Sequence, residues 1–302
     1  MAFQTKRALC LPGSGCRGAF QFGVIKRLAE LGERFDVVAG ASSGSICGAV
    51  MVAGLADVGS DFFRSLANTK ILSRRYLRSD GGPFGMATIV REALGRFVPN
   101  DRIVSSDTEL LVSTTRASRF LRSAFEVATS KVRALPLRRP AQDPPNQTFP
   151  FARPSPVHAL AVRSESLVVH SNRSRSNMHD VIVASCTIPG LYARLVVLDG
   201  EVHVDGGAAD NTLLGELLAR GITDITVVTP YMGGAVSPTL FERERTPRVP
   251  PHVRLRLISP ERTIRLRHFD FDPERLEEAL TMPFKVEVFE PSEPRAAVAC
   301  GG

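Results

Sequence analysis

Tryptophan is absent from this chain of 302 residues, and tyrosine occurs only three times. The formal net charge is +7 and the pI is about 9.5, a balance that suits anionic partners such as nucleic acid or an acidic lipid surface. Sites for single-stranded nucleic acid interleave basic residues with aromatic ones, but the basic runs at residues 131–139 and 254–267 contain no aromatic residue. No recognition motif for nucleic acid occurs either. We therefore expect no nucleic-acid partner.

Cysteine pairs and long apolar runs are also missing. The five cysteines are scattered without a C-x-x-C pair, which excludes a zinc knuckle and a disulfide framework, so we expect no metal site. The least polar stretch, residues 46–58, is interrupted by Gly48, Gly54 and Asp57, and it cannot span a bilayer, which needs about 20 apolar residues. The apolar run at the N-terminus is too short for a signal peptide. These features predict a cytoplasmic protein.

The chain does contain short apolar runs that alternate with helical patterns. Residues 7–11 and 35–39 are apolar runs of strand length, and residues 18–31 and 43–54 show helical spacing. Strands that alternate with helices predict an α/β fold with a mostly parallel central sheet and helices on its faces.

The rest of the chain gives a coarser pattern. It predicts helices at residues 61–77, 88–97 and 273–280, strands at 110–115, 167–170, 222–229 and 254–258, and a hairpin at 194–204 that turns at Asp199-Gly200. Residues 135–156 are rich in proline and predict a loop. No linker divides the chain, so we expect a single domain over residues 1–302, with the motifs within about 7–230 and no role assigned to 231–302.

A glycine-rich loop follows the first predicted strand. Residues 13–18 read GSGCRG, a G-x-G-x-x-G pattern that leads into a helix and is typical of phosphate-binding loops. A dinucleotide site also needs an acid at the end of the second strand, whereas Asp36 stands at the start of that strand. A Walker-type loop is excluded because no Gly-Lys-Ser/Thr follows. A nucleotide-binding or anion-binding protein without hydrolytic activity stays open as an alternative.

The second predicted strand ends in another motif. Residues 40–44 read GASSG, a G-x-S-x-G pattern between a strand and a helix, which is the setting of a nucleophile elbow. The free N–H groups at the start of the helix favour developing negative charge. Ser42 is therefore a candidate nucleophile with Gly40 and Gly44 as the elbow glycines. The alternative is that Ser42 is only the N-cap of the helix.

A serine nucleophile needs a base. His252 and His268 lie among arginines and prolines and favour surface positions. His203 shares a strand face with Asp205, and a lone strand histidine is usually structural. Asp205 ends the predicted hairpin and precedes two glycines, so its carboxylate could closely approach another loop. An ordinary Asp-Gly turn is the alternative.

Taken in order, these motifs resemble those of the patatin-like phospholipase family. Residues 13–18 look like its G-G-G-x-R/K-G loop, residues 40–44 like its G-x-S-x-G elbow, and residues 205–207 like its D-G-G/A motif. Residues 184–189 (ASCTIP) are similar to a further family segment that ends in proline. Ser14 departs from the pattern, because the family usually has glycine there and a side chain narrows the loop. Each motif alone is modest, but the ordered set is specific.

The resemblance implies a three-layer α/β/α fold and a Ser–Asp dyad that uses neither a catalytic histidine nor a cofactor. Aspartate is a weaker base than histidine, so it needs a partly desolvated setting that raises its pKa. The family's roles fall here on Ser42 as nucleophile, Asp205 as base, Gly13, Ser14, Gly15 and Cys16 as oxyanion-binding residues, and Arg17 and Gly18 as supports of the loop.

The implied substrate is a lipid acyl ester, such as a phospholipid, lysophospholipid or acylglycerol, that is cleaved through an acyl-enzyme. An acyltransferase on the same fold is the alternative activity. The basic runs at residues 131–139 and 254–267 could bring the protein to an anionic membrane surface as a peripheral contact, although arginines that alternate along a strand are typical of a solvated face. The sequence does not give the oligomeric state.

Overall fold

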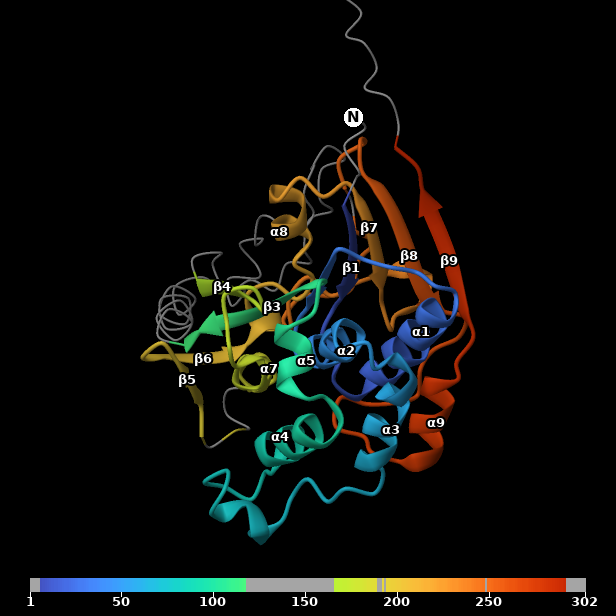
Figure 1. Cartoon of the computed structure of the whole chain (residues 1–302). Coiled ribbons are helices and arrows are strands. Elements are labelled where there is room, and N and C mark those ends of the chain that lie inside the picture. Colours follow the sequence, from blue (N-terminus) through green and yellow to red (C-terminus); the bar gives the residue numbers. More distant parts are fainter. Residues whose placement is uncertain (1–5, 118–165, 189–191, 193, 248, 292–302) are drawn as a thin grey trace, which may run out of the picture.

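The structure is a computed structural model that describes residues 6–117, 166–188, 192, 194–247 and 249–291 (Figure 1). The strands are β1 (Arg7–Leu11), β2 (Val37–Gly40), β3 (Glu109–Arg116), β4 (Leu167–Ser171), β5 (Val196–Leu198), β6 (Glu201–Asp205), β7 (Asp224–Val228), β8 (Arg254–Pro260) and β9 (Phe284–Phe289). The α-helices are α1 (Gly18–Glu30), α2 (Ser43–Val52), α3 (Ala56–Leu66), α4 (Met86–Phe97), α5 (Asn100–Val104), α7 (Met178–Ser185), α8 (Leu214–Ala219) and α9 (Pro273–Leu280). The predicted loop at residues 135–156 and the basic run at 131–139 lie outside the described residues.

The strands form one mixed sheet in the order β5-β6-β3-β2-β1-β7-β8-β9, with β4 also paired to β3. The inner strands β3, β2, β1, β7 and β8 are mutually parallel, whereas β4, β6, β5 and β9 add antiparallel pairs at the ends of the sheet. Along β1, Leu9 and Leu11 enter one hydrophobic core, while Ala8 and Cys10 enter the other. Burial on both faces explains why the parallel strands read as unbroken apolar runs. The predicted α/β fold with a mostly parallel sheet is confirmed.

The two faces of the sheet are covered unequally. The larger core lies under α1, α2, α3, α4, α7 and α9. On the other face the described residues contribute α8 and the segments around Val236 and Val253 to a smaller core, and α8 stands apart from the other helices in Figure 1. No helix in the described ranges has the length and apolar character needed to cross a bilayer.

Most predicted elements are confirmed to within a few residues, including the hairpin, where Asp199 and Gly200 have φ of 51° and 79°. Positive φ at both positions is what a tight two-residue turn requires. The helix predicted at residues 61–77 is confirmed only as far as Leu66, where α3 ends, because Asn68 then takes a left-handed conformation with φ of 61°. The sequence analysis missed α5, α7, α8 and β9, of which α5 and α8 are too short to show a clear period.

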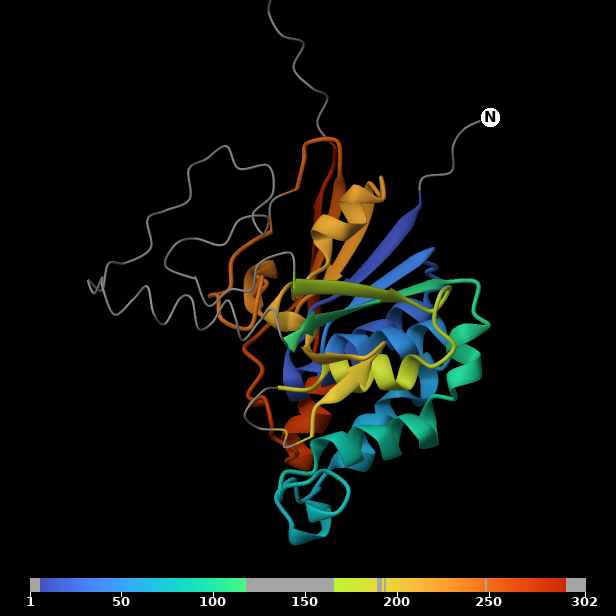
Figure 2. The same cartoon turned by 90° about the vertical axis from the view of Figure 1, so that its left-hand side faces the viewer.

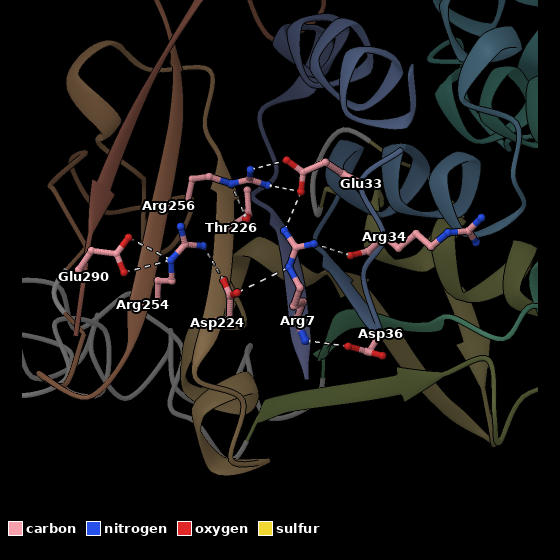
Figure 3. Close-up of polar contacts among 9 residues, drawn as sticks. All are labelled: Arg7, Glu33, Arg34, Asp36, Asp224, Thr226, Arg254, Arg256 and Glu290. Carbon is pink, nitrogen blue, oxygen red and sulfur yellow. Dashed lines mark hydrogen bonds and ion pairs between the residues drawn. The ribbon is translucent and has the colours of Figure 1, made fainter. Parts of the chain in front are cut away.

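Alternating charges join the starting ends of β1, β7 and β8 (Figure 3). Arg256 binds Glu33 at 2.5 Å, and Glu33 also binds Arg7 at 2.6 Å, so a residue of β8 is joined to the residues that follow α1. Arg254 contacts Asp224 at 3.5 Å and Glu290 at 3.2 Å. We call this set of residues the charge ladder. Because Arg254 and Arg256 are neutralised within the protein, they offer little free positive charge to a membrane surface.

Candidate active site

The G-x-S-x-G motif forms a tight turn between β2 and α2. Ser42, the residue between them, has φ of 49° and ψ of −127°, a conformation that non-glycine residues rarely adopt. A Cβ on Gly44 would lie 1.8 Å from the Leu11 carbonyl oxygen, and one on Gly40 would lie 2.5 Å from the Gly44 carbonyl oxygen. Both elbow positions therefore exclude any side chain. This is the backbone geometry of a nucleophile elbow.

The Ser42 hydroxyl points to Asp205. Its Oγ donates a hydrogen bond to Asp205 Oδ2 at 2.8 Å, and the other carboxylate oxygen accepts one from the Gly207 N–H at 2.8 Å. Ser42 makes no side-chain cap on α2, although it holds the N-cap position. The structure thus brings together the predicted nucleophile and the predicted base, and it does not support the capping alternative for Ser42.

The register of three strands explains how these distant residues meet. β4 pairs with β3 from Leu111 to Thr115 and occupies one edge of β3. The other edge is shared by β2, which ends with Gly40 opposite Val112, and by β6, which ends with Asp205 opposite Thr114. β2 and β6 run toward each other, so their ends are separated by one β3 residue. The elbow that follows β2 therefore meets the end of β6.

Burial sets the acidity of Asp205. The side chain is fully buried, and this desolvation raises the pKa of Asp205 from 3.8 to about 7, against the opposing effect of the hydrogen bonds from Ser42 and Gly207. A carboxylate accepts a proton most effectively when its pKa lies near the working pH. The environment of Asp205 therefore suits a general base at neutral pH.

The glycine-rich loop lies beside the elbow, but its N–H groups are not equally available. Gly13 donates to Asn211 Oδ1 at 2.9 Å, Ser14 to Ser43 Oγ at 3.0 Å, and Cys16 to the carbonyl oxygen of His268 at 3.0 Å. Within the described part of the chain, the N–H of Gly15 donates to no protein group. Of the four predicted oxyanion donors, Gly15 is the one that is free in this structure.

The remaining loop residues have positions consistent with support. Ser14 is buried with φ of −156°, which requires no glycine, so the loop accommodates this departure from the family pattern. Arg17 Nε donates to the Leu266 carbonyl oxygen at 3.0 Å, and its guanidinium lies 5.6 Å from the centre of the Tyr231 ring. A Cβ on Gly18 would lie 3.2 Å from Ser43, so α1 starts close against the elbow.

Three polar residues that the sequence analysis did not assign hold the site together. Asn211 accepts from the Gly13 N–H and donates to the Gly13 carbonyl at 3.0 Å, which ties the loop to the segment after Asp205. Ser185 Oγ accepts from the Ser42 N–H at 2.8 Å, and the Thr187 carbonyl accepts from the Asp205 N–H at 2.8 Å. Ser185 and Thr187 lie in the ASCTIP segment, so its similarity to the family was the available signal.

No histidine in the described ranges forms a hydrogen bond with the Ser42 hydroxyl or the Asp205 carboxylate. His203 Nδ1 and His170 Nε2 share the Thr114 hydroxyl, each at 2.8 Å. Desolvation lowers the pKa of both, that of His170 to about 4, which keeps the rings neutral. His252 and His268 are exposed, and His268 also lines the cavity beside Ser42 and contributes its backbone oxygen to the loop. These positions agree with the structural and surface roles predicted for the histidines.

Ser42 and Asp205 open into an apolar cavity. Its walls come from α3, α4 and the segments around Tyr192 and Phe269, with Phe62, Phe63, Leu66 and Met86 among the lining side chains. Such a cavity favours a hydrocarbon chain over a charged ligand. Among the described residues, no three His, Cys, Asp or Glu side chains are grouped closely enough to hold a metal ion.

The fold and this geometry define an α/β protein with a serine at a nucleophile elbow. The patatin-like phospholipase family model matches residues 9–218 of the 302, and the chain belongs to that family. The family consists of lipid acyl hydrolases that act on lipid substrates. The predicted family is thereby confirmed.

The solved structure of VipD from Legionella pneumophila is similar with a TM-score of 0.31 and 15% identity, over 77% of this chain and 51% of the VipD chain. This chain therefore spans about half the length of that chain. A search of curated proteins gave no match.

Proposed function

We propose that this protein hydrolyses acyl esters of phospholipids, lysophospholipids or acylglycerols with Ser42 as nucleophile and Asp205 as base. The proposal rests on one observation above the others: the hydroxyl of a serine in a strained elbow donates to a fully buried carboxylate at 2.8 Å. The apolar cavity beside this pair fits the acyl chain of the ester. Membership of the family supplies the class of reaction.

The chemistry follows from these positions. Ser42 Oγ attacks the ester carbonyl carbon while its proton passes to Asp205 Oδ2, and the carbonyl π electrons move onto oxygen. The tetrahedral intermediate collapses, the alcohol leaves with the proton from Asp205, and the acyl group stays on Ser42. Water then attacks the acyl-enzyme and gives its proton to Asp205. The second collapse releases the fatty acid and restores the serine hydroxyl.

The oxyanion of each intermediate needs aimed N–H donors. We assign this role to the N–H of Gly15 and to that of Ser43, the first residue of α2, because neither donates to another protein group within the described ranges. Gly13, Ser14 and Cys16 then shape the loop through the bonds that occupy their N–H groups. The same occupancy leaves few donors for a phosphate, which argues against the nucleotide-binding alternative.

The deciding experiment replaces the nucleophile. We expect Ser42→Ala to abolish turnover of p-nitrophenyl butyrate and covalent labelling by a fluorophosphonate, with an unchanged far-UV spectrum, whereas His252→Ala retains both activities because His252 is exposed. Retained turnover in Ser42→Ala would overturn the proposal. Product analysis with an added lysolipid acceptor separates hydrolysis from acyl transfer on the same site.

A further inference from the structure

The connection between α3 and α4 forms a separate projection, residues 70–84, which we call the basic lobe. It extends from the lower end of the molecule in Figure 1, and Figure 2 shows the same projection from the side. Its neck is closed by an isolated bridge between Leu72 and Phe84 and by a hydrogen bond from the Ser73 N–H to the Pro83 carbonyl at 2.8 Å. The basic lobe is therefore a closed loop with a defined shape.

The side chain of Tyr76 packs inside the basic lobe and holds its backbone in place. Its ring is buried and fills the space over Gly85, where a Cβ would lie 2.2 Å from the ring, and its hydroxyl donates to the Lys70 carbonyl at 3.2 Å. Tyr76 belongs to a 3₁₀ turn, Arg74–Leu77, whose other side chains are exposed. The guanidinium of Arg75 lies 4.5 Å from the centre of the Tyr76 ring and donates to the Tyr76 hydroxyl. A single buried anchor thus orients the outer surface.

The outer surface combines apolar and basic side chains. Leu72 is 69% exposed and Leu77 is 52% exposed, which are high values for leucine. Four exposed basic residues accompany them, and none forms an ion pair within the described part of the chain: Lys70, Arg74, Arg75 and Arg78. The one acid of the lobe, Asp80, is buried and accepts hydrogen bonds from Thr88. The exposed charged side chains of the lobe are therefore all positive.

The basic lobe is attached to the walls of the active-site cavity. Leu66, at the end of α3, and Met86, at the start of α4, both line the cavity, and the lobe joins them. Phe84 makes edge contacts with the rings of Tyr192 and Phe269, at centroid distances of 5.3 and 5.5 Å, and both rings also line the cavity. A partner bound to the lobe would lie next to this apolar wall.

We propose that the basic lobe docks the protein on the surface of a membrane that contains anionic lipids. Leucines enter the apolar boundary while arginines contact the headgroups, the combination that holds proteins at an interface. An acidic protein would satisfy the charges equally well, but the membrane also accounts for the apolar walls to which the lobe is attached. The inference rests on the proposed function, since the lobe joins two walls of the cavity that we propose for the acyl chain.

Co-sedimentation with vesicles tests the docking without using catalysis. The wild type should bind vesicles of phosphatidylcholine mixed with phosphatidylglycerol and bind pure phosphatidylcholine weakly. The double variant Arg74→Gln/Arg78→Gln should partition about thirty-fold less onto the anionic vesicles, because each basic residue at such a surface contributes roughly fivefold. Leu72→Ser/Leu77→Ser should lower partitioning about tenfold at all salt concentrations. The charge-dependent part should fall as salt is raised.

Matched variants on another surface serve as controls. Lys6→Gln/Lys285→Gln removes two exposed cations and Val286→Thr/Val288→Thr two exposed apolar groups far from the lobe in sequence, and both should bind as the wild type. Unchanged binding by the arginine variant, or equal binding to neutral and anionic vesicles, overturns the proposal. All variants should turn over p-nitrophenyl butyrate normally. If the wild type itself does not turn over p-nitrophenyl butyrate, the proposed hydrolase activity is overturned, whatever the vesicles show.

Discussion

Asp205 meets two opposing demands at the scale of a single residue. A base must be ionised, whereas complete burial favours the protonated carboxyl and raises the pKa of Asp205 to about 7. Its pKa in the folded chain exceeds that in the unfolded chain, so its contribution to stability is full below the ordinary value of 3.8. That contribution is lost as the pH rises through about 7. The ionised state that serves the proposed reaction is therefore the state that destabilises the fold.

We therefore expect Asp205→Asn to lose turnover and to gain stability at alkaline pH. Asparagine cannot ionise, so the variant escapes the loss of stability that the wild type suffers between pH 5 and pH 8. The free energy of unfolding of the variant minus that of the wild type should therefore be larger at pH 8 than at pH 5, by on the order of 2 kcal/mol. Wild-type kcat/KM should rise with pH through about 7. Urea unfolding at the two pH values and a pH–rate profile measure both effects.

The exposed Asp107 provides a control, since Asp107→Asn should show neither effect. A flat pH–rate profile between pH 5 and 9 in the wild type would contradict the assignment of Asp205 as the base. So would an equal change in stability at the two pH values.

At the scale of elements, the glycine-rich loop depends on Asn211. This buried side chain binds the N–H and the carbonyl of Gly13 and also the Ser237 carbonyl. Asn211→Ala leaves these groups without partners, which should cost about 3 kcal/mol of stability. Because the loop then shifts away from the elbow, kcat for p-nitrophenyl butyrate should fall about tenfold or more.

Asn172 is the matched control for this prediction. It is also buried, and it binds the Leu110 N–H and the carbonyls of Ile103 and Thr108, which are not among the residues of the site. Asn172→Ala should lose similar stability while its kcat stays normal. If both variants lose kcat equally, Asn211 has no special role in positioning the loop.

At the scale of elements, the sequence predicts local motifs but not how distant strands pair. Ser42 and Asp205 were predictable because each motif imposes local backbone constraints, such as the missing space at Gly44. The meeting of β2 and β6 along β3 depends on pairing register, and no local pattern encodes it. Residues 70–77 of the basic lobe were predicted as the end of a helix that starts at residue 61, whereas Asn68 breaks that helix with a left-handed backbone. Asn211 acts through a contact 198 residues away and left no local signal.

At the scale of the whole molecule, we propose that the described residues before and after segment 118–165 fold as one domain. The family model ends at residue 218, but β8 pairs with β7, and α9 lies so close to α1 that a Cβ on Gly23 would reach within 2.0 Å of the Leu280 carbonyl oxygen. The charge ladder joins the same parts through Glu33 and Arg256. The last third of the chain is thus part of the proposed domain.

Glu33→Gln tests this coupling. The Arg256 guanidinium beside Glu33 lowers the pKa of that carboxyl to about 2, so its stabilising effect is present above the ordinary value of 4.5 and is lost as the pH falls through about 2. At pH 7 the variant should lose about 2 kcal/mol from a single, still cooperative unfolding transition. Glu30→Gln, which removes an exposed ion pair with Arg27, should change stability little. Two separate transitions would contradict the single domain.

The end-to-end arrangement of β2 and β6 has a consequence for how the protein acquires activity. Ser42 and Asp205 lie 163 residues apart, and the strands β1, β2 and β3 can pair before β6 has found its place on β3. Such an intermediate would have an ordered elbow without its base. Long-range pairing is slow relative to local contacts. The rate at which ester turnover returns during refolding would therefore measure how fast the β5–β6 hairpin pairs with β3.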